Sequence, residues 1–146
     1  MKPIFITGTG TDVGKTLVSA IIVEALKADY WKPVQAGFSD GTDSMFVRQF
    51  ISNKTTVIHP ECYLLKMPAS PHLAAPAEKK EITIKEIIDH LPDTKNQLII
   101  EGAGGLMVPL NKSELTLDLI KKLKAKVIVV SKNELGSINH SLLTAD

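Results

Sequence analysis

The sequence predicts a three-layer α/β fold with a doubly wound, mostly parallel sheet. Short apolar runs alternate with amphipathic stretches along the 146 residues, which is the order expected of strands alternating with helices. A glycine-rich loop follows the first apolar run and leads directly into the first helical pattern. A hydrophobic share of 44% is enough to bury a core, so we expect residues 1–146 to form one domain.

Four apolar runs are predicted as strands. They lie at residues 4–6, 30–34, 98–100 and 127–130. Continuous apolar runs of this length indicate parallel strands that are buried on both faces. A further short strand is expected at 62–65, inside a stretch from 54 to 80 whose four prolines otherwise predict irregular structure.

Apolar residues recur at helical spacing between the predicted strands. The helices are expected to begin near Leu17 and to cover 44–51, 84–91 and 115–123. Ile138, Leu142 and Leu143 indicate the opening of one more helix. The chain stops at Asp146 without a glycine cap, so we expect a domain that is truncated at its C-terminus. A frayed terminal helix is the alternative.

Residues 8–16 read GTGTDVGKT, a phosphate-binding loop between the first strand and the first helix. Small residues let backbone N–H groups converge on phosphate oxygens, the Lys15 ammonium adds positive charge, and the Thr16 hydroxyl can bind Mg²⁺. Gly8 and Gly14 enclose five residues instead of four, so the loop is a longer variant. We therefore predict a P-loop NTPase type of fold that binds a nucleoside triphosphate. The alternative is a glycine-rich turn with a solvated lysine.

Three polar or glycine-rich segments follow the later strands, at 32–37, 101–105 and 131–140. Open α/β sheets bind ligands at the carboxyl ends of their strands, so we expect these segments to lie beside the phosphate loop. Glu101, directly after its strand, can bind Mg²⁺ opposite Thr16, either directly or through water. A solvated glutamate at a strand end is the alternative.

Asp43 and Lys32 each allow two interpretations from the residues alone. Asp43 stands ahead of a helix, where an N-cap requires the same residue type as a metal ligand, and its spacing favours the cap. Lys32 can extend from its strand end into solvent, or it can offset charge beside a triphosphate. The sequence leaves the two roles of Lys32 equally open.

Composition excludes several classes of function. A net charge of +1 gives no electrostatic basis for binding nucleic acid or an anionic membrane surface. No apolar stretch approaches the length that spans a membrane. Cys62 is the single cysteine, so there is no internal disulfide, and the four histidines lack the spacing of metal ligands. We expect a cytoplasmic protein and assign neither Cys62 nor the histidines a chemical role.

Six segments in this order resemble the dethiobiotin synthetase family across essentially the whole chain. They are GTGTDVGKT at 8–16, KPVQAG at 32–37, the segment around Asp43, SPHLAAP at 70–76, EGAGGLMVPL at 101–110 and LGSINHSLLT at 135–144. The resemblance implies an enzyme that uses ATP and Mg²⁺ to close a ureido ring on 7,8-diaminononanoate with carbon dioxide, in biotin biosynthesis. It also implies a homodimer with the substrate site at the subunit interface.

The resemblance implies a role for each residue that matches the family motifs. The nucleotide would be bound by Gly10, Thr11, Asp12, Val13, Gly14, Lys15, Thr16 and Leu17. Thr16, Asp43 and Glu101 would surround Mg²⁺, which changes the favoured role of Asp43 from cap to ligand. Lys15 would contact the β- and γ-phosphates.

The resemblance also assigns the chemistry and the substrate contacts. Lys32 would stabilise a substrate carbamate and the transferring phosphoryl group, with Thr11 near the carbamate, so Lys32, Lys15 and Thr11 are the candidate catalytic residues. Substrate contacts would come from Lys32, Ala36 and Gly104, together with Ser137, Ile138 and Asn139 of the neighbouring subunit. Ala36 departs from the serine or threonine of many relatives, which removes a hydroxyl near the substrate.

Two rival functions stay open at this point. One is a related P-loop ATPase, such as a partitioning or cobyrinate-amidating relative, although partitioning ATPases carry a lysine where this chain has Gly10. The other is a catalytically inactive fragment that still binds a nucleotide. Family chains continue past residue 146 with the segments that bind the nucleotide base, so no base pocket is assigned.

Overall fold

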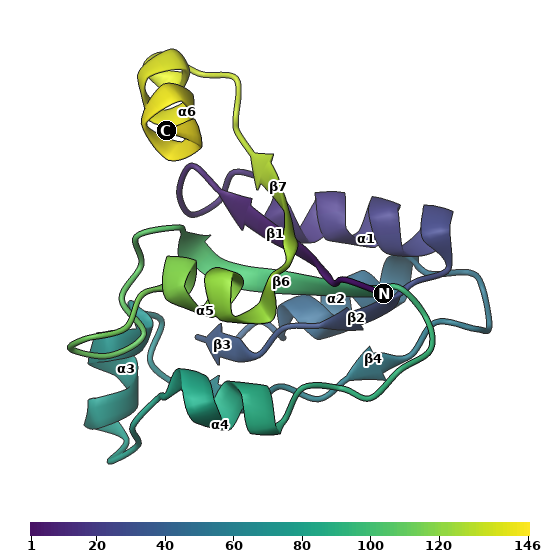
Figure 1. Cartoon of the computed structure of the whole chain (residues 1–146), viewed down its shortest axis with the longest axis horizontal. Helices are drawn as coiled ribbons and strands as arrows, with labels where there is room; N and C mark the ends of the chain where they lie inside the picture. The colour runs from purple at the N-terminus through teal and green to yellow at the C-terminus, as the bar shows by residue number, and fades with distance from the viewer.

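A five-stranded parallel sheet forms the centre of the computed structural model, which describes residues 1–146 (Figure 1). The strand order is β4-β2-β6-β1-β7, and every neighbouring pair runs parallel. The strands are β1 (Ile4–Gly8), β2 (Asp29–Trp31), β4 (Ile58–His59), β6 (Leu98–Gly105) and β7 (Lys126–Val130). The central position of β1 and β6 places the loops that follow them at the middle of one sheet edge.

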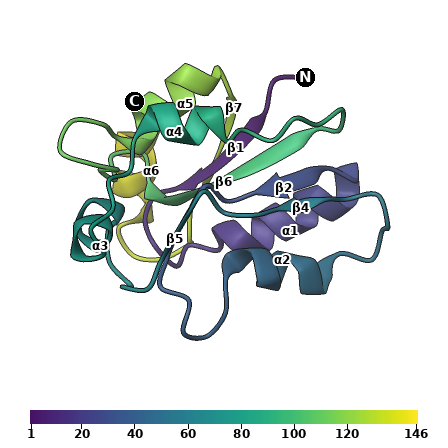
Figure 2. The same ribbon diagram turned by 90° about the horizontal axis from the view of Figure 1, so that it is seen from below.

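Helices cover both faces of the sheet (Figure 2). Two helices lie on one face, α1 (Lys15–Leu26) and α2 (Asp43–Phe50), and two on the other, α4 (Ile84–Asp89) and α5 (Thr116–Leu123). This arrangement confirms the predicted three-layer α/β fold of P-loop NTPase type. None of the helices is both long and apolar enough to cross a lipid bilayer.

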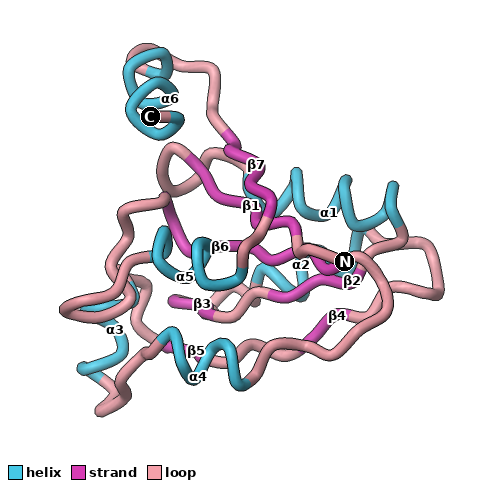
Figure 3. The backbone as a smooth tube through the Cα atoms, viewed as in Figure 1, coloured by secondary structure: helices cyan, strands magenta, loops and turns pink.

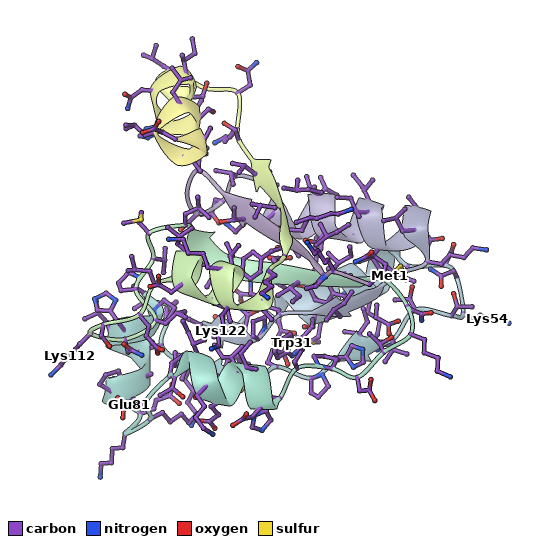
Figure 4. The ribbon with its side chains drawn as sticks, in the orientation of Figure 1. Met1, Trp31, Lys54, Glu81, Lys112 and Lys122 are labelled. Atoms are coloured by element: carbon purple, nitrogen blue, oxygen red, sulfur yellow. The ribbon has the colours of Figure 1, made fainter.

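Consecutive residues of the central strands point to opposite faces of the sheet and fill two separate cores. Phe5 and Trp31 belong to the core beneath α4 and α5. Their chain neighbours Ile6 and Tyr30 belong to the core beneath α1 and α2. Each of these four side chains is at most 1% exposed, so the central strands are buried on both faces as predicted (Trp31 is labelled in Figure 4).

The predicted strand at 30–34 is wrong in one respect, because it divides into two. β2 ends at Trp31, and β3 (Val34–Ala36) follows after Lys32 and Pro33. A proline has no N–H for the sheet ladder, so the strand breaks there. β3 pairs with β5 (Tyr63–Leu65) in a separate parallel sheet of two strands, which confirms the short strand expected at 62–65.

The stretch from 54 to 80 is more regular than predicted. Besides β4 and β5 it holds a seven-residue helix, α3 (Pro71–Ala77). Pro71 lies in the first turn of α3, where the missing N–H would have no helical partner in any case. The prediction of irregular structure from the prolines was therefore wrong in part, because Pro71 begins a helix.

β7 and α6 (Ser137–Ala145) are largely exposed. β7 is an edge strand, and Val127 and Val129 are 44% and 40% exposed, so burial on both faces was wrong for this strand. The helix expected after residue 137 is confirmed as α6, which stands away from the sheet and has no buried residue (Figures 1 and 3). The apolar side chains of α6 therefore contribute nothing to the two cores.

Replacement of Gly102 by alanine is expected to lower the free energy of unfolding by about 1–3 kcal/mol, the usual cost of overpacking a core. A Cβ on Gly102 would meet Cε1 of the fully buried Phe5 ring at 2.7 Å. Gly10→Ala is the matched control, because nothing lies within 4 Å of its added Cβ. Urea unfolding measures both variants, and equal stability would contradict the steric argument.

Candidate functional site

A cavity of about 770 Å³ opens at the carboxyl edge of the parallel sheet. It brings together the phosphate loop, the end of β2, the start of α2 and the second half of β6. Its lining comprises Thr11, Asp12, Gly14, Lys15, Thr16, Leu17, Lys32, Gln35, Ala36, Asp43, Phe46, Pro68, Ala69, Ser70, Pro71, Glu101, Ala103, Gly104 and Val108. The segments predicted to meet beside the loop thus meet there, apart from the one that carries α6.

The phosphate loop joins the end of β1 to the start of α1 (Figure 3). Gly14 occupies the N-cap with a φ of 98°, a left-handed conformation that glycine adopts without steric cost. No side chain caps α1, and its first turn carries no acidic residue. The exposed N–H groups and the helix dipole therefore favour an anion at this point.

Lys15 is held against its own loop. Its Nζ donates a hydrogen bond of 2.8 Å to the carbonyl oxygen of Gly10. Burial lowers the pKa of Lys15, and the nearby Lys32 ammonium lowers it further. Two lysine side chains therefore reach the same cavity, where an anionic ligand would relieve their repulsion.

Glu101 accepts hydrogen bonds from three donors, which lie in α1, in β2 and in the link between β2 and β3. Its Oε1 accepts from the Thr16 hydroxyl at 2.9 Å and from Lys32 Nζ at 3.0 Å, and its Oε2 accepts from the Tyr30 hydroxyl at 2.9 Å. The residue is fully buried and lies within β6, which runs on to Gly105. Both the predicted end of that strand at residue 100 and the alternative of a solvated glutamate were therefore wrong.

Lys32 is bound by two carboxylates, those of Glu101 and Asp43. Burial alone would lower the pKa of Lys32, but the charges of Glu101 and Asp43 outweigh it and raise the pKa above its ordinary value. The side chain is 6% exposed. The structure thus places Lys32 inside the cavity wall and excludes the solvent-exposed alternative.

Asp43 is not the N-cap that its spacing favoured. The cap of α2 is Thr42, whose hydroxyl accepts a hydrogen bond from the backbone N–H of Met45. This leaves the Asp43 carboxylate free to face Lys32. Gln35 fixes the backbone here, since its side-chain oxygen accepts from the Asp43 N–H at 3.2 Å while its amide nitrogen donates to the Gly37 carbonyl at 2.8 Å.

Sequence reasoning missed Tyr30 and Gln35. Tyr30 lies in an apolar strand and was predicted as core, and no spacing rule links it to a glutamate 71 positions away. Gln35 was inside the KPVQAG segment, but its partner Asp43 belongs to the next helix. Only the positions of the strands in the fold bring these groups to the site.

The oxygen donors at this edge suit a hard divalent cation. The Thr16 hydroxyl and the carboxylates of Asp43 and Glu101 all line the cavity, and Thr16 is within hydrogen-bond distance of Glu101. Small hard cations such as Mg²⁺ prefer oxygen ligands, commonly with one or two carboxylates and several waters. This donor set fits Mg²⁺ and offers no nitrogen or sulfur ligand.

Several predicted residues lie outside the cavity lining. Gly10 contributes its carbonyl oxygen to Lys15, and Val13 packs beside the core under α1. Ser137, Ile138 and Asn139 lie in the first turn of α6, away from the cavity of their own chain. The geometry within one chain thus gathers the predicted metal residues and all the predicted nucleotide residues except Gly10 and Val13, but leaves the α6 residues apart.

Cys62 lies outside the cavity as well. Burial, together with the nearby Glu86 carboxylate, raises the pKa of its thiol to about 11. A thiol that stays protonated at neutral pH is a weak nucleophile. This agrees with the expectation that Cys62 takes no part in covalent catalysis.

Comparison with known proteins gives consistent matches over the full chain. A family described as AAA domain matches residues 2–146. A protein of Cytophaga hutchinsonii is 56% identical over 146 residues, which cover 99% of this chain and 69% of the relative. Proteins of Christiangramia forsetii and Paramagnetospirillum magneticum are 53% and 44% identical, over 99% and 100% of this chain and 69% of each relative. All three relatives are described as ATP-dependent dethiobiotin synthetases.

Proposed function

This chain belongs to the ATP-dependent dethiobiotin synthetase family, and we propose that it is the synthetase that forms dethiobiotin, ADP and phosphate from 7,8-diaminononanoate, carbon dioxide and ATP. The observation that carries the proposal is the convergence of Lys15, Thr16, Lys32, Asp43 and Glu101 on one cavity. The single cysteine supports the reducing cytoplasm as the place of action.

The phosphate loop would hold the triphosphate of ATP. The open first turn of α1 offers N–H groups, and Lys15 offers a mobile charge that now contacts only the Gly10 carbonyl. Thr11, Asp12, Gly14 and Leu17 line the same cavity. These residues would orient the γ-phosphoryl group toward Lys32.

Thr16, Asp43 and Glu101 would hold Mg²⁺ between the phosphate loop and β6. Bound Mg²⁺ supplies positive charge that offsets the negative charge of the β- and γ-phosphates. Glu101 is preset for this role, because Tyr30 fixes one of its oxygens and leaves the other facing Thr16. Gln35 would set Asp43 in place through the backbone.

The reaction would proceed by carbamate formation and phosphoryl transfer. One substrate amine takes up carbon dioxide, and a carbamate oxygen attacks the γ-phosphorus and displaces ADP. The second amine then attacks the carbonyl carbon of the resulting mixed anhydride, closes the ring and expels phosphate. Lys32 would stabilise the anionic carbamate and the transferring group, with Thr11 alongside. Phe46, Pro68 and Val108 give the cavity an apolar side that suits an aliphatic carbon chain.

We also propose a homodimer in which Ser137, Ile138 and Asn139 of one subunit complete the substrate site of the other. Leu142 and Leu143 on α6 are exposed, and Gly136 caps the helix without a side-chain bond, so the N–H groups of its first turn are available to a substrate carboxylate. Sedimentation equilibrium tests the dimer. A monomer at the concentrations used for activity would contradict it.

The assay for the proposed activity supplies the chain with MgATP, bicarbonate and diaminononanoate and measures dethiobiotin by mass spectrometry. Product formation supports the synthetase. ATP binding without substrate-dependent phosphate release would instead support the inactive nucleotide-binding fragment. The same assay is also run on a version extended to the length of the relatives. Product from the extended version alone would mean that activity needs the added segment, whereas an extended chain without product would overturn the proposal.

Replacement of Lys15 by alanine is expected to weaken ATP binding by roughly 10- to 100-fold. The loss corresponds to one hydrogen bond to a charged group, about 1.5–3 kcal/mol. Isothermal titration calorimetry measures the affinity for ATP. Lys112→Ala removes an equal charge from an exposed loop (Figure 4) and is the control, so the proposed role of Lys15 is wrong if both variants bind ATP like the wild type.

A further inference from the structure

A second group of metal-binding side chains lies outside the cavity, where the segment before β5 meets α4. One ligand atom each from Cys62, Glu86 and His90 lies within 4.8 Å of the other two. Glu86 and His90 are four positions apart, so they share one face of α4. We propose that these three side chains bind a borderline divalent cation of the Zn²⁺ class, independently of the synthetase reaction.

His90 is oriented as metal-binding histidines usually are. Its Nδ1 lies 2.8 Å from the backbone carbonyl oxygen of Glu86. A carbonyl oxygen only accepts hydrogen bonds, so Nδ1 carries the proton and Nε2 keeps its lone pair. A hydrogen bond from one ring nitrogen to a carbonyl fixes the tautomer of most histidine ligands.

Glu86 is held by two hydrogen bonds of its own. Its Oε2 accepts from the hydroxyl of the buried Tyr63 at 2.6 Å, and its backbone N–H donates to the Thr83 hydroxyl at 3.2 Å. These bonds fix the start of α4 and leave the second carboxylate oxygen without a bond from the protein. Such supporting contacts are typical around metal ligands.

The mixture of donors decides the class of cation. A sulfur, a nitrogen and an oxygen ligand suit Zn²⁺ and related late transition metals, whereas Mg²⁺ and Ca²⁺ prefer oxygen alone. Three protein ligands leave a fourth position for water in tetrahedral geometry. The cation would displace the thiol proton of Cys62 to solvent, because the thiolate is the form that binds a metal.

The side chains have room to close around an ion. Ligand atoms on one tetrahedral Zn²⁺ lie roughly 3.3–3.8 Å apart, given bonds of about 2.0–2.3 Å. The present limit of 4.8 Å requires a contraction of about 1.5 Å at most at the longest pair. Glu86 and His90 are exposed and Cys62 is half-buried, so small rotations of the Glu86 and His90 side chains are sufficient.

Spectroscopic titration with Co²⁺ tests the proposal on the full chain in excess Mg²⁺, which keeps Co²⁺ from the oxygen ligands of the cavity. A thiolate bound to Co²⁺ gives a near-ultraviolet charge-transfer band, and Cys62 is the single source of such a band. We expect one Co²⁺ per chain, displaced by Zn²⁺. Absence of the band at saturating Co²⁺ would overturn the proposal.

Two variants sharpen the test. His90→Ala is expected to weaken Zn²⁺ binding by at least about tenfold, whereas His140→Ala, an equal change on the exposed α6, leaves it unchanged. Zn²⁺ is also expected to raise the melting temperature of the wild type and of His140→Ala but not that of His90→Ala. Equal Zn²⁺ affinity of the two variants would show that the cluster is not the site.

Discussion

Replacement of Lys32 by methionine is expected to lower the rate of dethiobiotin formation by about 10³-fold, the scale found when a charge that stabilises a phosphoryl-transfer transition state is removed. Lys32 is the buried cation that contacts both Asp43 and Glu101. Its charge faces the position proposed for the carbamate and the transferring phosphoryl group. ATP affinity is expected to change much less than turnover, because the phosphate loop is retained.

The same substitution has a second expected effect, on stability. Removing one partner of a buried ion pair leaves the other charge without compensation, at a cost of about 3–5 kcal/mol in the free energy of unfolding. Glu101 is fully buried and would lose its cation. Mg²⁺ is expected to restore part of this stability, since it would replace the lost positive charge.

Lys85→Met is the matched control for Lys32→Met. Lys85 also pairs with a carboxylate, that of Asp89, but the two side chains are 86% and 56% exposed. Exposed pairs of this spacing contribute about 0.3–0.5 kcal/mol, so this variant is expected to keep its turnover and nearly all its stability. Steady-state kinetics and urea unfolding compare the two. Similar losses in both variants would mean that burial of the Lys32 pair has no special importance.

The phosphate loop was predictable because its information is local. Residues 8–16 contain both the conformational requirement, glycine at a left-handed N-cap, and the chemical one, the lysine and threonine that follow. Strand and helix periodicity on either side then fixed its context. The alternation of apolar runs with helical patterns predicted parallel strands, whose carboxyl ends meet at one sheet edge, and the fold confirms this. The order of the strands was not predicted.

The network around Glu101 was only partly predictable, because its contacts are long-range. The pattern of residues 98–105 indicated a carboxylate at the sheet edge, but Tyr30 and Gln35 are joined to the site only through the strand order. The cluster of Cys62 with Glu86 and His90 is a similar case. Spacing along the chain showed no metal site, since Cys62 precedes β5 while Glu86 and His90 lie on and directly after α4, and only packing brings them together.

Local rules failed where tertiary contacts decided the outcome. Asp43 had the spacing of a cap, yet Thr42 takes the cap and Lys32 takes the carboxylate. Val127 belongs to a continuous apolar run, yet its strand lies at the sheet edge and is exposed. Apolar content predicts that a strand exists, but only neighbouring elements determine whether both faces are covered.

The carboxylates of the site depend on their own cations before any ligand binds. Asp43 and Glu101 face Lys32, and Lys15 lies nearby with a pKa lowered by burial and by Lys32. Two positive and two negative groups balance each other in the wall of one cavity. This pairing compensates the buried charges in the free protein. It also provides carboxylates that can bind a metal ion and ammonium groups that can bind a phosphate.

Replacement of Glu101 by glutamine is expected to lower turnover by about 10²–10³-fold and to raise the Mg²⁺ concentration needed for activity. Glu101 accepts three hydrogen bonds on two oxygens, two from Thr16 and Lys32 on one side and one from Tyr30 on the other. Glutamine has one acceptor oxygen, so its NH₂ group must face a donor on one side. The variant therefore loses the charge of the proposed metal ligand and disturbs the network that positions it.

Tyr30→Phe separates these two losses. It removes only the hydrogen bond to Oε2 and keeps the Glu101 charge, so we expect a loss of about 0.5–1.5 kcal/mol in the free energy of unfolding. Its Mg²⁺ requirement is expected to rise by about tenfold, as for other residues that support a metal ligand. Kinetics over a range of Mg²⁺ concentrations compares the two variants with the wild type. A direct ligand cannot lose its charge without lowering the affinity of the site for Mg²⁺. If Glu101→Gln therefore requires no more Mg²⁺ than the wild type, Thr16 and Asp43 alone would hold the metal.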